Sequence, residues 1–171
     1  MTAKFRTRRA EARDADSIAR IYNEGIEDRV ATFETEKRDG AERRRWLLEH
    51  DARHPVIVAE DGKGRVVGWA SISSISQRKC YSGVGEYSVY VGRESRGKGV
   101  GTELLSAVIE GARSLGYWKL LGRMFASNET SRALARRFGF RDVGVLEKHG
   151  KLDGKWLDVL EVEKVFPENL D

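Results

Sequence analysis

A glycine-rich turn with two cations offers the clearest chemistry in this sequence. Residues 96–101 read Arg-Gly-Lys-Gly-Val-Gly, between an apolar run that ends at Val91 and a helical pattern that starts near Thr102. Strand, turn and helix in that order expose backbone N–H groups at the positive end of the helix dipole, which suits a pyrophosphate. Glycines let the backbone approach the phosphates closely, and Arg96 and Lys98 add positive charge.

The turn matches neither of the two common nucleotide-binding motifs. The P-loop requires GxxxxGK[ST], but here Gly99 follows Lys98. The dinucleotide fingerprint requires GxGxxG, and the spacing from Gly97 is GxGxG, one residue too short. The spacing alone therefore allows two interpretations, an RxxGxG-type pyrophosphate loop or a tight basic turn without a ligand. Two features strengthen the first: the preceding strand carries an acid, Glu86, and a further strand and helix follow at Asn128.

Length and composition limit the class of protein. The chain has 171 residues, of which 40% are apolar and 34% charged, and this predicts one globular domain over 1–171. The single Cys80 excludes an internal disulfide, and the absence of a His or Cys cluster predicts no metal site. No apolar run reaches the roughly 18 residues of a membrane helix, and no signal-peptide pattern is present. We therefore expect a cytoplasmic protein without a membrane partner.

The excess of basic over acidic residues is compatible with a nucleic-acid partner. The net charge is +4, but acidic residues interrupt the cations in most segments. No recognition motif or basic stripe with interleaved aromatic residues is present, so we expect no nucleic-acid binding.

The apolar patterns predict an α/β (α+β) fold with helices on both faces of a mixed, mostly antiparallel sheet of about seven strands. Asp14 or Asp16 is the expected N-cap of the first helix, and Asn128 that of the last. The loop 30–33 is apolar, which is unusual unless a loop lines something. Strands are expected over 5–10, 56–59, 65–75, 86–91, 120–125, 141–147 and 156–166, and helices over about 16–26, 42–50, 102–115 and 128–138.

Over nearly its whole length the chain resembles the GCN5-related N-acetyltransferases (GNAT). Within them it is similar to the phosphinothricin, methionine sulfoximine and arsinothricin N-acetyltransferases. The matching segments are residues 21–23, 31–36, 54–60, 86–91, 96–101, 128 with 131, and 154–159. The resemblance implies a GNAT fold and an enzyme that transfers the acetyl group of acetyl-CoA to the primary amine of such a small amino acid by direct attack. It also implies a role in antibiotic or herbicide resistance and a possible homodimer.

The resemblance also assigns residues to the coenzyme. The strand that ends at Val91 would bind the pantetheine arm through its backbone, the turn would bind the pyrophosphate, and the start of the last helix would contact the far end of coenzyme A. The coenzyme-binding residues implied in this way are Val89, Tyr90, Val91, Arg96, Gly97, Lys98, Gly99, Val100, Gly101, Thr102, Asn128 and Ser131.

Glu86 is the candidate catalytic base and also a contact for the acceptor amine. Amide formation from a thioester requires a deprotonated amine, and a solvated carboxylate with a pKa of about 4.3 is a weak base for an ammonium. The role therefore requires burial or a relay through water. For the acceptor, Phe33 would form an apolar wall, while Arg78, with Tyr81 beside it, would hold an acidic group. The alternative is that Glu86 and Arg78 are merely exposed charges.

The sequence departs from the family pattern at two positions. Many relatives carry a Tyr or His on the last helix as a candidate acid for the leaving thiolate, where this chain has Ala135. Some carry a His after the Trp of the C-terminal motif, where this chain has Leu157. Whether the enzyme uses a general acid is therefore open, and so is the physiological acceptor. We expect Cys80 not to be an acetylated nucleophile.

Two other functions stay open at this stage. The first is acetylation of protein N-termini or lysines, which requires an open peptide groove. The second is a non-catalytic domain that binds acyl-CoA or nucleic acid, for which strongly salt-dependent DNA binding would be the sign.

Overall fold

The computed structural model describes residues 5–170, so residues 1–4 and 171 of the predicted domain lie outside the described part. Seven strands form one sheet in the order β1-β2-β3-β4-β5-β7-β6. All neighbours are antiparallel except β4 and β5, which are parallel. The predicted fold class is thereby confirmed. The strands are β1 (Arg6–Arg9), β2 (Val56–Glu60), β3 (Val66–Ser74), β4 (Val84–Val91), β5 (Lys119–Phe125), β6 (Arg141–Leu152) and β7 (Lys155–Val165).

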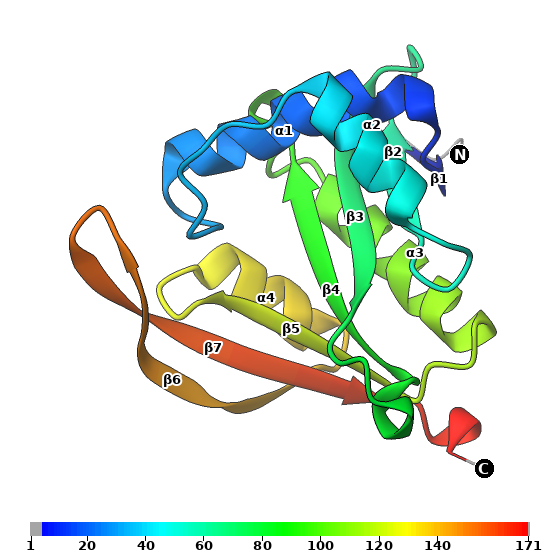
Figure 1. Ribbon diagram of the computed structural model, residues 1–171, viewed down its shortest axis with the longest axis vertical. Helices are drawn as coiled ribbons and strands as arrows, with labels where there is room; N and C mark the ends of the chain where they lie inside the picture. The colour runs from blue at the N-terminus through cyan, green and yellow to red at the C-terminus, as the bar shows by residue number, and fades with distance from the viewer. Residues whose placement is uncertain (1–4, 171) are drawn as a thin grey trace.

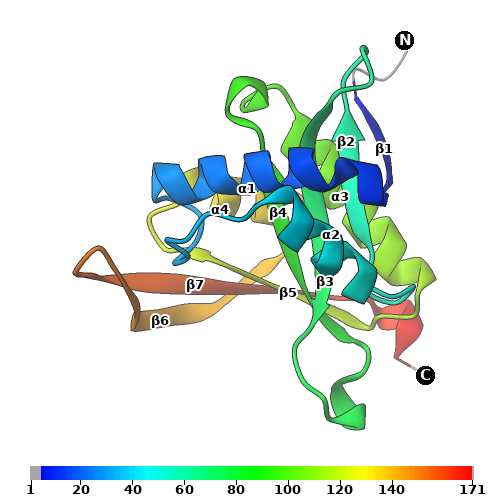
Figure 2. The same cartoon turned by 45° about the horizontal axis from the view of Figure 1, so that its top comes forward.

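Four α-helices cover the sheet. Helices α1 and α2 lie on one face and α3 and α4 on the other (Figures 1 and 2). They are α1 (Ala15–Asp28), α2 (Gly40–Glu49), α3 (Val100–Ser114) and α4 (Glu129–Arg137). Short 3-10 turns lie at Ala12–Asp14, Lys79–Tyr81, Arg93–Ser95 and Pro167–Asn169.

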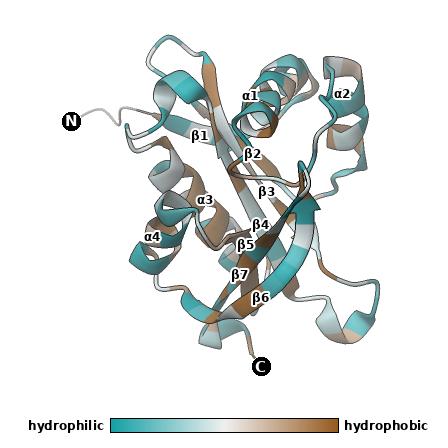
Figure 3. Cartoon of the chain, turned by 90° about the vertical axis from the view of Figure 1, so that its left-hand side faces the viewer, coloured by the Kyte–Doolittle hydropathy of each residue, from teal (hydrophilic) through white to brown (hydrophobic). Residues whose placement is uncertain are grey.

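The core consists of two layers and a smaller cluster. The larger layer packs α3 against the sheet, with Leu104, Leu105 and Val108 fully buried. The layer on the other face packs α1 against β2 and β3 around Ile18 and Trp69. In Figure 3 the apolar colour lies on the sheet-facing sides of the helices, as their helical periodicity predicts.

Most element boundaries differ from the predictions by one or more residues, and two of these differences have an identifiable cause. Helix α3 begins at Val100 rather than 102, because Gly99 adopts a φ of 95° and takes the N-cap position. Strand β4 begins at Val84, so Glu86 is its third residue. Gly85 precedes it within the strand, where a Cβ would lie 2.7 Å from the Ile72 side chain. Strand β6 runs to Leu152 instead of 147, because its pairing with β7 resumes after a bulge.

The two predicted N-cap residues differ in what their side chains bind. Asn128 caps α4, since its side chain accepts a hydrogen bond from the Ser131 N–H. For α1 the predicted position is confirmed, since Asp14 is the N-cap residue, but its side chain makes no cap hydrogen bond to the helix. Its carboxylate accepts instead from the Arg8 guanidinium (2.7 Å) and from the N–H of Glu11 (2.8 Å), and so belongs to the preceding 3-10 turn.

Candidate active site

The site is built on the separation of β4 from β5. The two strands pair in parallel only from Val84↔Lys119 to Tyr87↔Gly122. Beyond this rung β4 continues beside β3 and β5 continues beside β7, and Figure 1 shows the two arms diverging. The edge of β4 over residues 88–91 therefore has no strand partner on the β5 side. Apart from the Val91 carbonyl, which accepts a hydrogen bond from Arg96, the backbone groups of this edge have no strand partner and are suited to bind an extended ligand as an added strand would bind.

A glycine stands at the point of separation. The Tyr87 ring lies over Gly122 in the last rung, where a Cβ would come within 2.5 Å of the ring. The same ring contacts Phe140, with centroids 5.1 Å apart. Tyr87 is buried, and desolvation raises the pKa of its hydroxyl above the ordinary value. The β4–β5 contact thus requires glycine at position 122 for a packing reason.

The glycine-rich turn lies at the far end of the diverging β4. Gly97 and Gly99 have φ values of 70° and 95°, in the left-handed region that favours glycine, and nothing lies within 4 Å of where a Cβ would sit on either. The first N–H groups of α3 have no partner within the helix because of their position. The turn therefore presents amide donors to open space, as a pyrophosphate site requires.

The two cations of the turn have different surroundings. Lys98 is exposed. Arg96, in contrast, donates from Nε to the Val91 carbonyl (3.1 Å) and forms an ion pair with Asp28 at the end of α1. Hydrogen bonds from Arg93 and Arg96 hold the pKa of the Asp28 carboxyl below its ordinary value. Arg96 thus ties the turn to α1 and β4, and a contact of its guanidinium with phosphate stays a prediction.

Most side chains of the predicted coenzyme segment on β4 point into the core. The Tyr90 ring stacks on Trp69 at 4.8 Å and meets the Tyr22 ring edge-on at 5.1 Å. Val89 and Val91 pack against the α3 layer. Any contact with a coenzyme at these three positions must therefore come chiefly from the backbone. Val100 is likewise 1% exposed and acts as a core residue.

Asn128 connects α4 to the loop between α1 and α2. Beyond its cap bond to Ser131, its Nδ2 donates to the Val30 carbonyl at 3.1 Å. A contact of either residue with a coenzyme stays a prediction.

The loop between α1 and α2 reaches across to the β6–β7 hairpin. Arg29 forms a 2.8 Å ion pair with Asp153 in the hairpin turn. The Phe33 ring meets Phe125 edge-on at 4.8 Å and lies against Gly150, where a Cβ would come within 2.6 Å of it. The apolar loop therefore lies against the far end of the β5–β7 arm, and Phe33 forms a wall there.

Glu86 lies within the last paired segment of β4, with 30% of its side chain exposed. Its Oε2 accepts a hydrogen bond from Nη1 of Arg123 on β5 at 2.9 Å. Arg123 also donates from Nε to Oε2 of Glu161 on β7 at 2.8 Å. Sequence reasoning missed Arg123 and Glu161. The available signal was an arginine within an otherwise apolar strand, but nothing in the spacing shows that it contacts Glu86.

Arg78 and Tyr81 lie apart from this constellation. Both are exposed on the loop between β3 and β4, which projects beyond the sheet in Figure 2, and the Arg78 guanidinium lies 5.7 Å from the Tyr81 ring centroid. Neither residue has a contact with Glu86 in the described structure. Cys80 lies exposed on the same loop.

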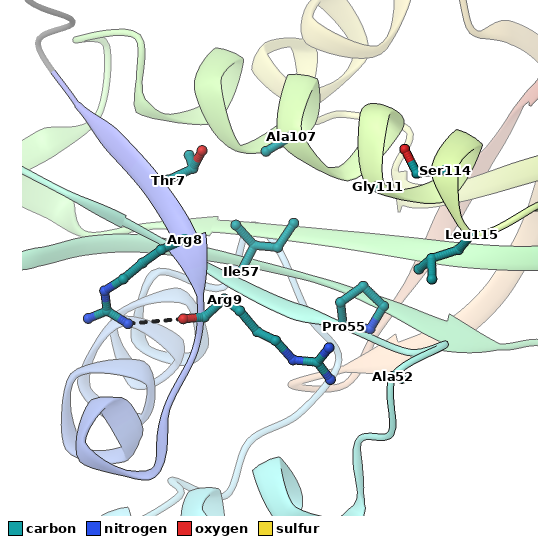
Figure 4. A pocket seen from close by; sticks show the side chains of 10 residues that line it. All are labelled: Thr7, Arg8, Arg9, Ala52, Pro55, Ile57, Ala107, Gly111, Ser114 and Leu115. Atoms are coloured by element: carbon teal, nitrogen blue, oxygen red, sulfur yellow. Dashed lines mark hydrogen bonds between the residues drawn. The ribbon is translucent and has the colours of Figure 1, made fainter.

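A cavity elsewhere in the molecule does not belong to this constellation. About 320 Å³ in volume, it lies between β1, β2 and α3 and is lined by residues that include Pro55, Ile57 and Leu115 (Figure 4). Neither Glu86 nor any residue of the turn lines it, and the hydrogen bond drawn in Figure 4 runs from Arg8 to the Arg9 carbonyl. We do not assign the reaction to this cavity.

Comparisons with known proteins agree with this geometry. Residues 18–140 match the family model "Acetyltransferase (GNAT) family". The chain is 36% identical over 163 residues to an L-methionine sulfoximine/L-methionine sulfone acetyltransferase of Pseudomonas paraeruginosa, covering 93% of this chain and 92% of the relative. The family resemblance inferred from the sequence is thereby confirmed.

Two solved structures have nearly the same fold. One is a GNAT superfamily phosphinothricin acetyltransferase from Sinorhizobium meliloti in complex with AcCoA, with a TM-score of 0.90 at 32% identity, covering 96% of this chain and 90% of that one. The other is a ribosomal-protein-alanine N-acetyltransferase from Brucella melitensis, with a TM-score of 0.90 at 34% identity, covering 94% and 99%. The described residues include no helix with the length and apolar character needed to cross a membrane.

Proposed function

This chain belongs to the acetyltransferase (GNAT) family, and on that premise we propose that it transfers the acetyl group of acetyl-CoA to the primary amine of a small amino acid or analogue, of the phosphinothricin or methionine sulfoximine type. One observation carries the proposal: a carboxylate, Glu86, lies where β4 and β5 part, and an open glycine turn lies at the other end of the same gap. The relatives named for such substrates span nearly the whole chain.

The residues of the gap have separable tasks. The turn N–H groups and Lys98 would hold the pyrophosphate, and the free edge of β4 would hold the pantetheine arm. Glu86 would accept the ammonium proton, directly or through water. The amine then attacks the thioester carbonyl, so that a C–N bond forms, the nitrogen gives its second proton to water, the C–S bond breaks and the thiolate of coenzyme A leaves.

The structure bears on whether a general acid assists that leaving group. Ala135 is fully buried, and Leu157 packs in the cluster around Phe125. Neither position therefore supplies an acid. We propose that the thiolate leaves without one, since a thiolate is a tolerable leaving group at neutral pH.

Acetylation of protein N-termini is the second candidate, because one structural neighbour is named for it. The contacts of Arg29 and Phe33 with the β6–β7 hairpin favour a bounded acceptor site over an open peptide groove. Resistance to a toxic amino-acid analogue, a cytoplasmic location and a homodimer stay predictions.

Two measurements test the proposal. Acetyl-CoA and CoA should raise the melting temperature and ATP should not, because only CoA derivatives combine the pyrophosphate with a pantetheine arm. Thiol release from acetyl-CoA should then require an amino-acid acceptor such as L-methionine sulfone or phosphinothricin. Equal melting shifts for ATP and CoA would contradict the coenzyme assignment. Acetylation of peptides with no activity on amino acids would favour the second candidate.

A further inference from the structure

Arg123 is the cation in direct contact with the proposed base. It lies on β5 one residue beyond the last rung shared with β4, and it joins Glu86 on β4 to Glu161 on β7. The Arg123 side chain is 44% exposed, so the pair can be reached from solvent. Its bonds to described residues use Nε and Nη1, which leaves Nη2 available to a ligand.

A second network on the same arm has similar chemistry but does not reach the base. Glu163, two residues beyond Glu161 on β7, binds Lys119 and Arg141. Hydrogen bonds from Lys119 and then Arg141 hold the pKa of the Glu163 carboxyl below its ordinary value. None of these three residues contacts Glu86 in the described structure. Variants in the two networks can therefore separate the effect of a charge on this arm from the effect of a charge in contact with the base.

A carboxylate and a guanidinium in contact are complementary to a zwitterionic α-amino acid. In such an acceptor one carbon carries both the ammonium and the carboxylate, so a group that binds the ammonium needs a donor beside it for the carboxylate, and a cation is a strong one. Arg123 meets this requirement, and its planar fork is suited to a carboxylate. Arg78 does not, because it lies on the projecting loop and forms no hydrogen bond or ion pair with Glu86 among the described residues.

We propose that Arg123 binds the α-carboxylate of the acceptor while Glu86 receives its amine, and that Glu161 holds Arg123 in place from the opposite side. Arg123 then selects free amino acids over peptide N-termini and lysine side chains, which have no carboxylate at the carbon that bears the amine. This inference rests on the proposed function. It leaves Arg78 available for a second acidic group at the far end of the acceptor.

The test compares an acid with its amide in matched variants. L-methionine sulfone and its α-carboxamide differ only at the group that Arg123 is expected to bind. Arg123→Gln should lower kcat/KM for the acid by about 10- to 100-fold, chiefly through KM, because a hydrogen bond to a charged group is lost. The amide should change by less than about threefold, because it has no carboxylate to lose that bond.

Three controls keep the result interpretable. Arg141→Gln removes an arginine of the neighbouring network and should leave both substrates unchanged. Arg123→Lys keeps the charge without the fork and should recover part of the loss for the acid. Circular dichroism and the melting temperature verify that each variant is folded.

The possible failures differ in meaning. An equal fall for acid and amide in Arg123→Gln would overturn the inference, because Arg123 would then only position Glu86. A wild-type enzyme that acetylates the amide better than the acid would also overturn it, while the proposed acetyl transfer would stand. An enzyme that binds acetyl-CoA but acetylates neither of these substrates nor any other amino acid would instead refute the proposed function, and the inference with it.

Discussion

The two halves of the sheet differ in how they are covered. Strands β1–β4 carry helices on both faces, and Trp69 in their midst is 3% exposed. The β5–β7–β6 half buries one face, through residues such as Leu160 and Val162, while charged side chains including Arg123 and Glu161 occupy the other. Glu86 lies where the covered half ends. The proposed base therefore lies at the limit of the helical cover, where a ligand can reach a face of the sheet.

The largest effect on activity is expected at Glu86, where the two halves of the sheet meet. Glu86→Gln removes the proposed base and should lower kcat by about 10²- to 10⁴-fold. Stability should change by less than about 0.5 kcal/mol, because the side chain is part-exposed and loses only a surface ion pair. Thiol-release kinetics and urea denaturation measure the two quantities. A variant with more than about a tenth of wild-type kcat would remove Glu86 from the mechanism, given the size of effect expected of a general base.

A pair of tryptophans contrasts the two halves directly. Trp69→Ala should cost about 3–5 kcal/mol of unfolding free energy, because the ring is buried among Tyr90 and Trp46. Trp156→Ala on β7 should cost less than about 0.5 kcal/mol, because that ring is 58% exposed. Urea denaturation of both variants measures the difference. Equal losses would mean that the second half is covered in solution, for example by another copy of the chain.

Gly122 on β5 and Gly144 on β6 differ in the space that a side chain would find there. Gly122→Ala should lose about 1–3 kcal/mol, because the new methyl group would meet the Tyr87 ring at the rung where β4 and β5 part. Gly144→Ala on β6 meets nothing within 4 Å and should leave the melting temperature unchanged or slightly raised. Thermal unfolding followed by circular dichroism suffices for both. An unchanged melting temperature in the first variant would show that Tyr87 moves aside without cost.

One carboxylate from each half allows a comparison by pH. Burial acts to raise the pKa of Asp14, but hydrogen bonds from Arg8 and the Glu11 N–H outweigh it, and the pKa lies below the ordinary 3.8. The stabilisation is therefore fully present above pH 3.8 and is lost as the pH falls through the lowered pKa. Asp14→Asn should cost about 1–3 kcal/mol at pH 7, and the difference from wild type should shrink in acid.

The corresponding change in the second half should be smaller. Glu163→Gln should cost at most about 1 kcal/mol at pH 7, because its partner Arg141 is 68% exposed. Its lowered pKa gives the same sign, with stability lost toward acid. Urea denaturation between pH 7 and pH 3 follows both carboxylates. A difference from wild type that grows toward acid in either variant would contradict the sign.

The smallest effect is expected at Cys80. The thiol is exposed on the projecting loop, and direct attack by the amine does not use it. Cys80→Ala should therefore keep most of the wild-type kcat in the thiol-release measurement. An inactive variant would argue for an acetylated cysteine and against direct transfer.

Local signals predicted much of this molecule. Apolar periodicity indicated the order and type of all seven strands and four helices, because one face of each element must be buried. Gly97 and Gly99 marked a turn whose positive φ angles require glycine, and Asn128 marked a helix start through its own side chain. Each of these signals acts within a few residues of itself, so one sequence suffices to detect it.

Contacts between distant segments could not be predicted in this way. Glu86 and Arg123 are 37 residues apart and meet only because β4 and β5 pair in parallel and then separate. Asp28 forms an ion pair with Arg96 across 68 residues of sequence. Local patterns were enough to identify the helices and strands, the glycine-rich turn and Glu86 on the strand that precedes it. The cation that contacts Glu86 could not be identified in this way, because strand pairing and helical cover depend on the packing of the whole chain.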